Sequence, residues 1–228
     1  MSAPPMVEVK DLSFHYGEGG FTLALPELTI ATGEKVAFVG PSGSGKTTLV
    51  YLIAGILEPD AGTVTVGGTK LAGMGDAGRR NFRISNIGFI FQEFELLDYL
   101  TTVENVMLPY LVNSSLVLDA TVRESARELL DSVGLCDMFD RKPEQLSHGE
   151  RQRVAVCRAL ITKPKIIVAD EPTGNLDPEN KASILDIIAD QVTQRDATLI
   201  VVTHDHSLLE RFDRTIDLGR AAGGECST

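Results

Sequence analysis

The segment Gly40–Thr47 has the residue types and spacing that suit the binding of phosphate groups. It reads Gly40, Pro41, Ser42, Gly43, Ser44, Gly45, Lys46, Thr47 and matches the pattern G-x-x-x-x-G-K-[ST]. Its glycines let backbone N–H groups converge on phosphate oxygens without a Cβ in the way. Lys46 suits the β/γ phosphates, and the Thr47 hydroxyl suits Mg²⁺. A glycine-rich turn is the alternative, but an apolar strand precedes the loop and a helix containing Thr48 follows it, so the segment predicts a nucleotide site.

Two acidic residues, Asp170 and Glu171, follow the apolar run 166–169. An acid at the carboxyl end of a parallel strand lies where α/β sheets bind ligands. We expect Asp170 to bind Mg²⁺ through water and Glu171 to orient or deprotonate the attacking water. Alone, these residues fit a solvated strand end. Together with the phosphate loop they predict an NTPase site.

A third motif, Leu146-Ser147-His148-Gly149-Glu150, lies about 20 residues before the acidic strand. Ser147 and Glu150 also form the pattern of a capping box, so a well-capped helix is the simplest interpretation. In this context, however, the sequence resembles the ATP-binding cassette (ABC) family, whose signature is L-S-G-G-Q. His148 and Glu150 depart from that signature. Position 148 has helical geometry and tolerates a side chain, whereas Glu150 adds charge near the nucleotide, and we expect slower closure or turnover.

The resemblance covers nearly the whole chain and implies a homodimer that sandwiches two Mg²⁺-ATP. Each site would join the phosphate loop of one copy to Ser147 and the Gly149 amide of the other. The other roles that it implies are adenine stacking for Tyr16, sensing of Mg²⁺ and partner for Gln92, a dimer contact for Asp177 and a γ-phosphate contact for His204. From local pattern alone, Tyr16 also fits a core aromatic, Gln92 a polar loop residue and His204 a structural or solvated histidine.

Hydrophobic patterning indicates which elements position these residues. Short apolar runs predict buried parallel strands at 36–39, 87–91, 166–169 and 199–202. Alternating patterns predict half-buried strands at 7–16, at 63–66 and at 21–31, the last interrupted by Pro26. Helices are expected at 48–56, 120–133 and 147–162, and a further helix opens with Asp177-Pro178. The predicted fold class is α/β.

The resemblance makes that fold a P-loop NTPase cassette in one domain, 1–228. Residues 1–92 and 163–219 would form a RecA-like core with an antiparallel β subdomain, and 93–162 a helical subdomain that carries the signature. Residues 220–228 are small and polar, and we expect a flexible tail. The three cysteines are an odd number without metal-like pairing, so we expect reduced thiols.

Net charge and hydrophobicity limit the kinds of partner that this chain is expected to bind. The net charge of −11 argues against binding to nucleic acid, which favours basic surfaces. No run approaches the roughly 18 apolar residues of a membrane span, and the N-terminus lacks a signal-peptide pattern. We therefore expect a cytoplasmic chain, and the family resemblance implies that it lies on the inner face of the cell membrane through an integral membrane permease.

The stretches Phe91–Leu97 and Glu104–Pro109 resemble the lipoprotein-release and macrolide-export branch of the family. In that branch the helical insertion forms a groove for the permease, and Phe94, Leu96, Leu97 and Tyr99 are expected either to line it or to pack in the core. The alternatives are a cassette that regulates a membrane complex without transport, as in cell division, and a soluble cassette acting on DNA or ribosomes. A phosphate-loop kinase is disfavoured because no acceptor pocket is evident. The cargo and its direction of transport are not encoded in these motifs.

Overall fold

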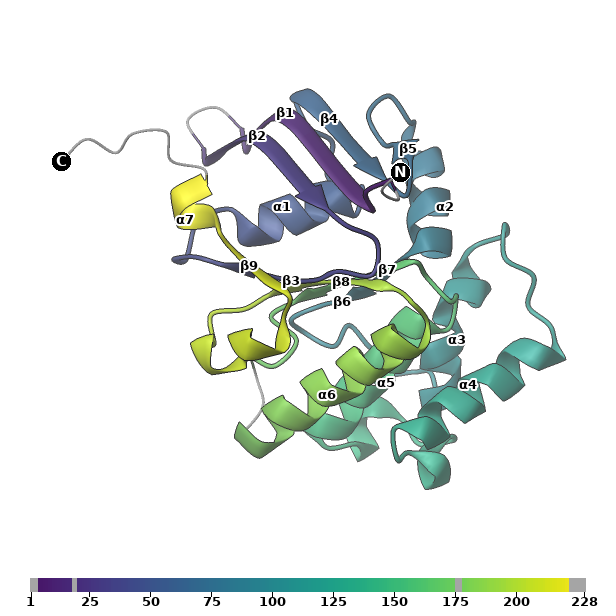
Figure 1. The fold of residues 1–228 in the computed structure, drawn as a ribbon. Helices are drawn as coiled ribbons and strands as arrows, with labels where there is room; N and C mark the ends of the chain where they lie inside the picture. Colours follow the sequence, from purple (N-terminus) through teal and green to yellow (C-terminus); the bar gives the residue numbers. More distant parts are fainter. Residues whose placement is uncertain (1–3, 18–19, 175–177, 222–228) are drawn as a thin grey trace.

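The computed structural model describes residues 4–17, 20–174 and 178–221 of the 228-residue chain, and these form two sheets with helices between and below them (Figure 1). The four-stranded antiparallel sheet has the order β2-β1-β4-β5, formed by Thr22–Ile30, Val7–His15, Ala61–Val66 and Thr69–Lys70. The five-stranded parallel sheet has the order β6-β7-β8-β3-β9, formed by Ile87–Ile90, Ile166–Asp170, Thr198–Val202, Lys35–Val39 and Arg214–Asp217.

The described helices are distributed over both faces of the parallel sheet. Their bounds are Lys46–Ile53 (α1), Asp76–Asn86 (α2), Thr102–Val112 (α3), Ala120–Ser132 (α4), His148–Leu160 (α5), Pro178–Gln194 (α6) and Leu218–Ala221 (α7). Figure 1 shows α1 between the two sheets and α5 and α6 below the parallel sheet, with α3 and α4 beside them. The helices α3 to α5 all come from the segment between β6 and β7, so this insertion forms a helical layer at one side of the molecule.

Side-chain alternation along the parallel strands divides the core in two. In β7, Ile166 and Val168 pack in a cluster with α1 and the antiparallel sheet. Ile167 and Ala169 point the other way, into a cluster with α3 to α6. Successive residues of a strand face opposite sides of the sheet, and a strand covered on both sides is apolar throughout. This explains why the continuous apolar runs correctly predicted the buried parallel strands.

Several predicted elements differ from the structure by one or two residues at their ends, and two differ more. The strand expected at 21–31 is not interrupted at Pro26, because β2 is an edge strand and proline needs no ladder hydrogen bond on the free side. The helix expected at 48–56 begins at Lys46 and ends at Ile53. The elements β5, α2, α3, β9 and α7 were not predicted as separate elements. The sequence of α2 is polar and contains Gly78, and its described side chains include no buried one.

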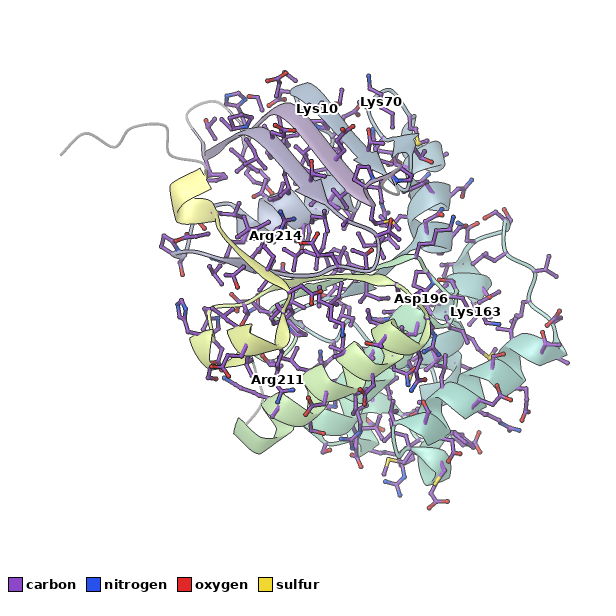
Figure 2. The ribbon with its side chains drawn as sticks, viewed as in Figure 1. Lys10, Lys70, Lys163, Asp196, Arg211 and Arg214 are labelled. Atoms are coloured by element: carbon purple, nitrogen blue, oxygen red, sulfur yellow. The ribbon has the colours of Figure 1, made fainter. Side chains whose placement is uncertain are left out.

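Because its strands are parallel, all their carboxyl ends meet at one edge of the five-stranded sheet. That edge receives the phosphate loop from β3, Glu171 from β7 and His204 from β8. Lys163 and Asp196 precede β7 and β8 and lie near each other at the opposite edge (Figure 2). Among the residues that the structure describes, every helix is too short or too polar to traverse a lipid bilayer.

Candidate nucleotide site at the carboxyl edge of the parallel sheet

The loop between β3 and α1 depends on glycine at three positions. Gly40, Gly43 and Gly45 have φ angles of +143°, +81° and +90°, a region that L side chains rarely adopt. A Cβ at Gly45 would also lie 2.7 Å from the ring of Phe21, and one at Gly40 would lie 2.9 Å from the Ser44 Oγ. The loop is therefore a backbone cradle that glycine keeps open, at the N-terminus of a helix.

Two polar side chains of the loop are positioned to contact an anion. The Lys46 ammonium is buried and donates hydrogen bonds to the carbonyl oxygens of Gly40 and Pro41, both at 2.9 Å. The Ser44 Oγ is also buried, and it has no hydrogen-bond partner among the described residues. A buried cation and an unpaired hydroxyl beside a glycine cradle fit the phosphates of a nucleotide.

The first carboxylate of the site, Asp170, is buried at the end of β7. Its Oδ1 accepts a hydrogen bond of 3.2 Å from the Thr47 hydroxyl. Burial raises the pKa of Asp170, and the charge of Glu171 adds to this, whereas Thr47 and Lys46 oppose it. Thr47 and Asp170 thus present two oxygens of the kind that Mg²⁺ binds, with room in its shell for water and phosphate oxygens.

We expect Asp170→Asn to raise the melting temperature (Tm) at neutral pH while it lowers ATPase activity. Because the folded pKa is raised, the folded state binds this proton more tightly than the unfolded chain, and stability falls as pH rises through that range. Asparagine removes this cost, and each kcal/mol shifts Tm by about 2–4 °C in a chain of this size. Calorimetry without nucleotide measures the Tm of Asp170→Asn. Asp190→Asn, on the exposed face of α6, is the matched control and should leave Tm unchanged. A lower Tm at neutral pH for Asp170→Asn contradicts it.

The second carboxylate, Glu171, has φ +46° and lies beside His204. Its N–H donates to the carbonyl oxygen of Val202 at 3.0 Å, which ties the end of β7 to β8. The Glu171 Oε2 is 3.3 Å from the His204 Nδ1, and the histidine side chain is 62% exposed. This arrangement leaves a carboxylate at the sheet edge next to an exposed imidazole, and such a pair can accept and hold a proton.

Gln92 and Tyr16 flank the site. Gln92 is exposed and comes two residues after Ile90, the last residue of β6, which pairs with Ala169 near the end of β7. Tyr16 is 45% exposed and meets the ring of Phe14 edge-on at 4.8 Å. Its N–H donates to the carbonyl oxygen of Phe21. Phe21 in turn lies against Gly45, so it links Tyr16 to the loop, a contact that the sequence analysis did not predict.

Ser147 and Gly149 are not part of this cluster. Ser147 is the exposed N-cap of α5, with the predicted capping box: the Glu150 carboxylate accepts from the Ser147 N–H at 2.6 Å. That hydrogen bond lowers the pKa of Glu150. The packed face of α5 belongs to the cluster on the opposite side of the sheet from α1. Asp177 and most of the tail 220–228 lie outside the described residues.

Comparisons with known proteins identify the family and relatives of this chain. The ABC transporter family model matches residues 24–174. The chain is 40% identical over 219 residues to the lipoprotein-releasing system ATP-binding protein LolD of Xanthomonas oryzae pv. oryzae, covering 95% of this chain and 89% of that protein. It is 41% identical over 216 residues to the protein of the same name from Geobacter metallireducens, with 93% and 95% covered.

A solved structure is similar over nearly the same span. It is the dimeric post-hydrolysis state of the ATP-binding cassette MJ0796 bound to ADP and Pi, with a TM-score of 0.82 and 34% identity, covering 94% of this chain and 95% of that one. The expected α/β cassette fold is confirmed. The chain belongs to the ABC transporter family, as an ATP-binding subunit that hydrolyses ATP.

Proposed function

We propose that this chain is the ATPase subunit of a lipoprotein-releasing ABC transporter, working as a homodimer on a membrane permease. The observation that carries the proposal is the alignment of the phosphate loop, Asp170, Glu171 and His204 at one sheet edge, in a chain similar to LolD over almost its whole length. The dimeric state of the MJ0796 cassette supports the homodimer. The proposed location is the inner face of the cell membrane, through the permease.

In this proposal the phosphate loop, Lys46 and Thr48 bind the triphosphate, and Tyr16 stacks on adenine. Thr47, Asp170 and Gln92 would hold Mg²⁺, which spreads the charge of the phosphate oxygens when it is bound. Glu171 accepts the proton of the attacking water, and His204 holds the γ-phosphate while its contact with Glu171 keeps the carboxylate in place.

The second copy supplies the remaining contacts to each nucleotide. Ser147 and the Gly149 amide form the start of α5, where the first N–H groups of a helix have no intrahelical partner. Ser147 is exposed, on a helix that packs on the far face of the sheet from α1. A shared site is therefore a better use of this helix start than a site within one chain, and Asp177 would add a contact across the same interface.

A groove with a volume of about 420 Å³ beside the helical layer is a candidate docking site for a partner protein. It lies between α2, β6, α3 and α5, and its cations are Arg80, Arg83 and Arg158. Its apolar lining is Ile84, Ile87, Phe89, Phe91, Leu108, Pro109, Val112 and Ala159. The residues expected to line such a groove, Phe94, Leu96, Leu97 and Tyr99, are not among its lining: Leu96 packs against the helical core and Tyr99 is exposed. We propose that the permease docks in the groove.

Two exposed valines provide a test of this docking surface. Val112 is 68% exposed and lines the groove, whereas Val117 is 77% exposed and does not. Tagged chains carrying Val112→Glu or Val117→Glu are purified from native membranes in mild detergent with ATP, and co-purifying proteins are identified by mass spectrometry. We expect Val112→Glu to lose a polytopic membrane protein at least about tenfold, because a carboxylate in an apolar interface is strongly unfavourable, and Val117→Glu to retain it. Equal recovery contradicts docking in the groove. Recovery of ribosomal or DNA-repair proteins alone contradicts the transporter.

A further inference from the structure

Helix α5 holds the loop after Gln92 through a buried arginine near its C-terminal end. Arg158 donates hydrogen bonds to the carbonyl oxygens of Glu95 and Phe94, the second at 2.7 Å. Burial lowers the pKa of Arg158 to about 10. The two carbonyl oxygens replace the water molecules that the buried guanidinium has lost. Glu95 has φ +49°, a conformation that is uncommon outside glycine, which shows that this loop is held in a defined shape.

The same loop is also contacted by the first residue of α5. The His148 ring meets the Phe94 ring edge-on, with centroids 5.6 Å apart and an angle of 72° between the rings. His148 follows Ser147 directly and stands where the family signature has glycine, which could not make this contact. Phe94 is thus held by its ring at the start of the helix and by its backbone ten residues further along.

We propose that His148 and Arg158 are positioning residues that fix the Gln92 loop to the signature helix through Phe94, so that the loop and Ser147 move as one body. This inference rests on the roles proposed above for Gln92 and Ser147. The helix has 13 residues, begins with a capping box and packs on α3 and β6, so it is a stiff connection. A change at Gln92 in one nucleotide site would then shift the helix start that serves the other site. In this proposal His148 has a positioning role of its own, at a position where the family signature has glycine.

The test is a double-mutant cycle on the isolated full-length chain, with ATPase rate, ATP affinity and Tm measured for each variant. We expect His148→Ala and Phe94→Ala each to lower kcat about fivefold, in line with the usual strength of an aromatic pair. The double variant should fall no further, because both changes remove one contact. His148→Phe should restore kcat to within about twofold. The Kd for ATP and Tm should stay close to those of the unchanged chain, which separates positioning from general loss of structure.

Two further variants make the outcome decisive. Arg158→Lys keeps the charge but cannot bridge two carbonyls, and we expect a similar fall in kcat. Additive effects in the cycle, an unchanged kcat in His148→Ala, or no recovery in His148→Phe would overturn the proposal. Gln92→Ala distinguishes failure of this inference from failure of the role proposed for Gln92. If Gln92→Ala lowers kcat and His148→Ala does not, only the positioning role of His148 and Arg158 is wrong. If Gln92→Ala has no effect, the role proposed for Gln92 is wrong.

Discussion

Glu171→Gln is expected to lower ATP turnover about 10²- to 10⁴-fold, the usual contribution of general-base assistance. Glutamine has nearly the shape of glutamate and can still contact the His204 ring, but it cannot take the proton of the attacking water. ATP binding should be unaffected, because the phosphate loop and its lysine are unchanged. The variant should therefore stop after nucleotide binding, with both ATP molecules intact between two copies.

Light scattering with and without ATP measures this trapped state. We expect the mass of the Glu171→Gln chain to double on addition of ATP and to return to the monomer value when ATP is removed. Glu210→Gln, an exposed change beyond β8, is the matched control and should keep its turnover and its reversible association. A Glu171→Gln chain that binds ATP and stays a monomer contradicts the shared nucleotide site. Normal turnover in this variant contradicts Glu171 as the base.

Lys46→Met is expected to weaken ATP binding about 10- to 100-fold, the usual range for losing a hydrogen bond to a charged group. Methionine retains much of the length and the apolar stem of the side chain, so the change removes mainly the buried ammonium at the mouth of the loop. Lys46 is the first residue of α1, and among the described residues its ammonium donates hydrogen bonds to the carbonyl oxygens of Gly40 and Pro41 in the loop, so folding should change little.

Titration calorimetry with ATP measures the Kd of the Lys46→Met chain. Lys35→Met is the matched control, since Lys35 begins β3 and lies at the opposite end of the same strand from the loop. We expect the control to bind ATP as the unchanged chain does. If both variants bind ATP equally well, the cradle between β3 and α1 is not the nucleotide site.

The parts of the site that lie at strand ends could be predicted from the sequence. An apolar run followed directly by chemistry-bearing residues is enough to place Gly40, Asp170 and His204 at one edge, because parallel strands bring their carboxyl ends together. The capping box at Ser147 is likewise a local pattern, and the structure contains it. The roles of these residues remain predictions until the variants are measured.

Contacts between distant segments could not be predicted in this way. Arg158 is 63 and 64 residues from the carbonyls that it holds, and nothing in its own neighbourhood indicates a loop on the other side of the insertion. Phe21 reaches Gly45 only because the two sheets enclose α1. The loop before α3 shows the same limit: its sequence fits both groove lining and core packing for Leu96 and Leu97, and the buried Asn105, which bonds the backbone of Leu97 from eight residues away, fixes that loop.

The left-handed backbone at Glu171 has an evolutionary consequence. At φ +46°, glycine, asparagine and aspartate are the residues that the chain tolerates best, and glutamate is not one of them. Replacing Glu171 with any of these three would cost little stability and could increase it. Mutational drift at this position is therefore opposed only by the loss of activity. Relatives that have given up hydrolysis should lose this glutamate early, and they should do so without any compensating change elsewhere in the fold.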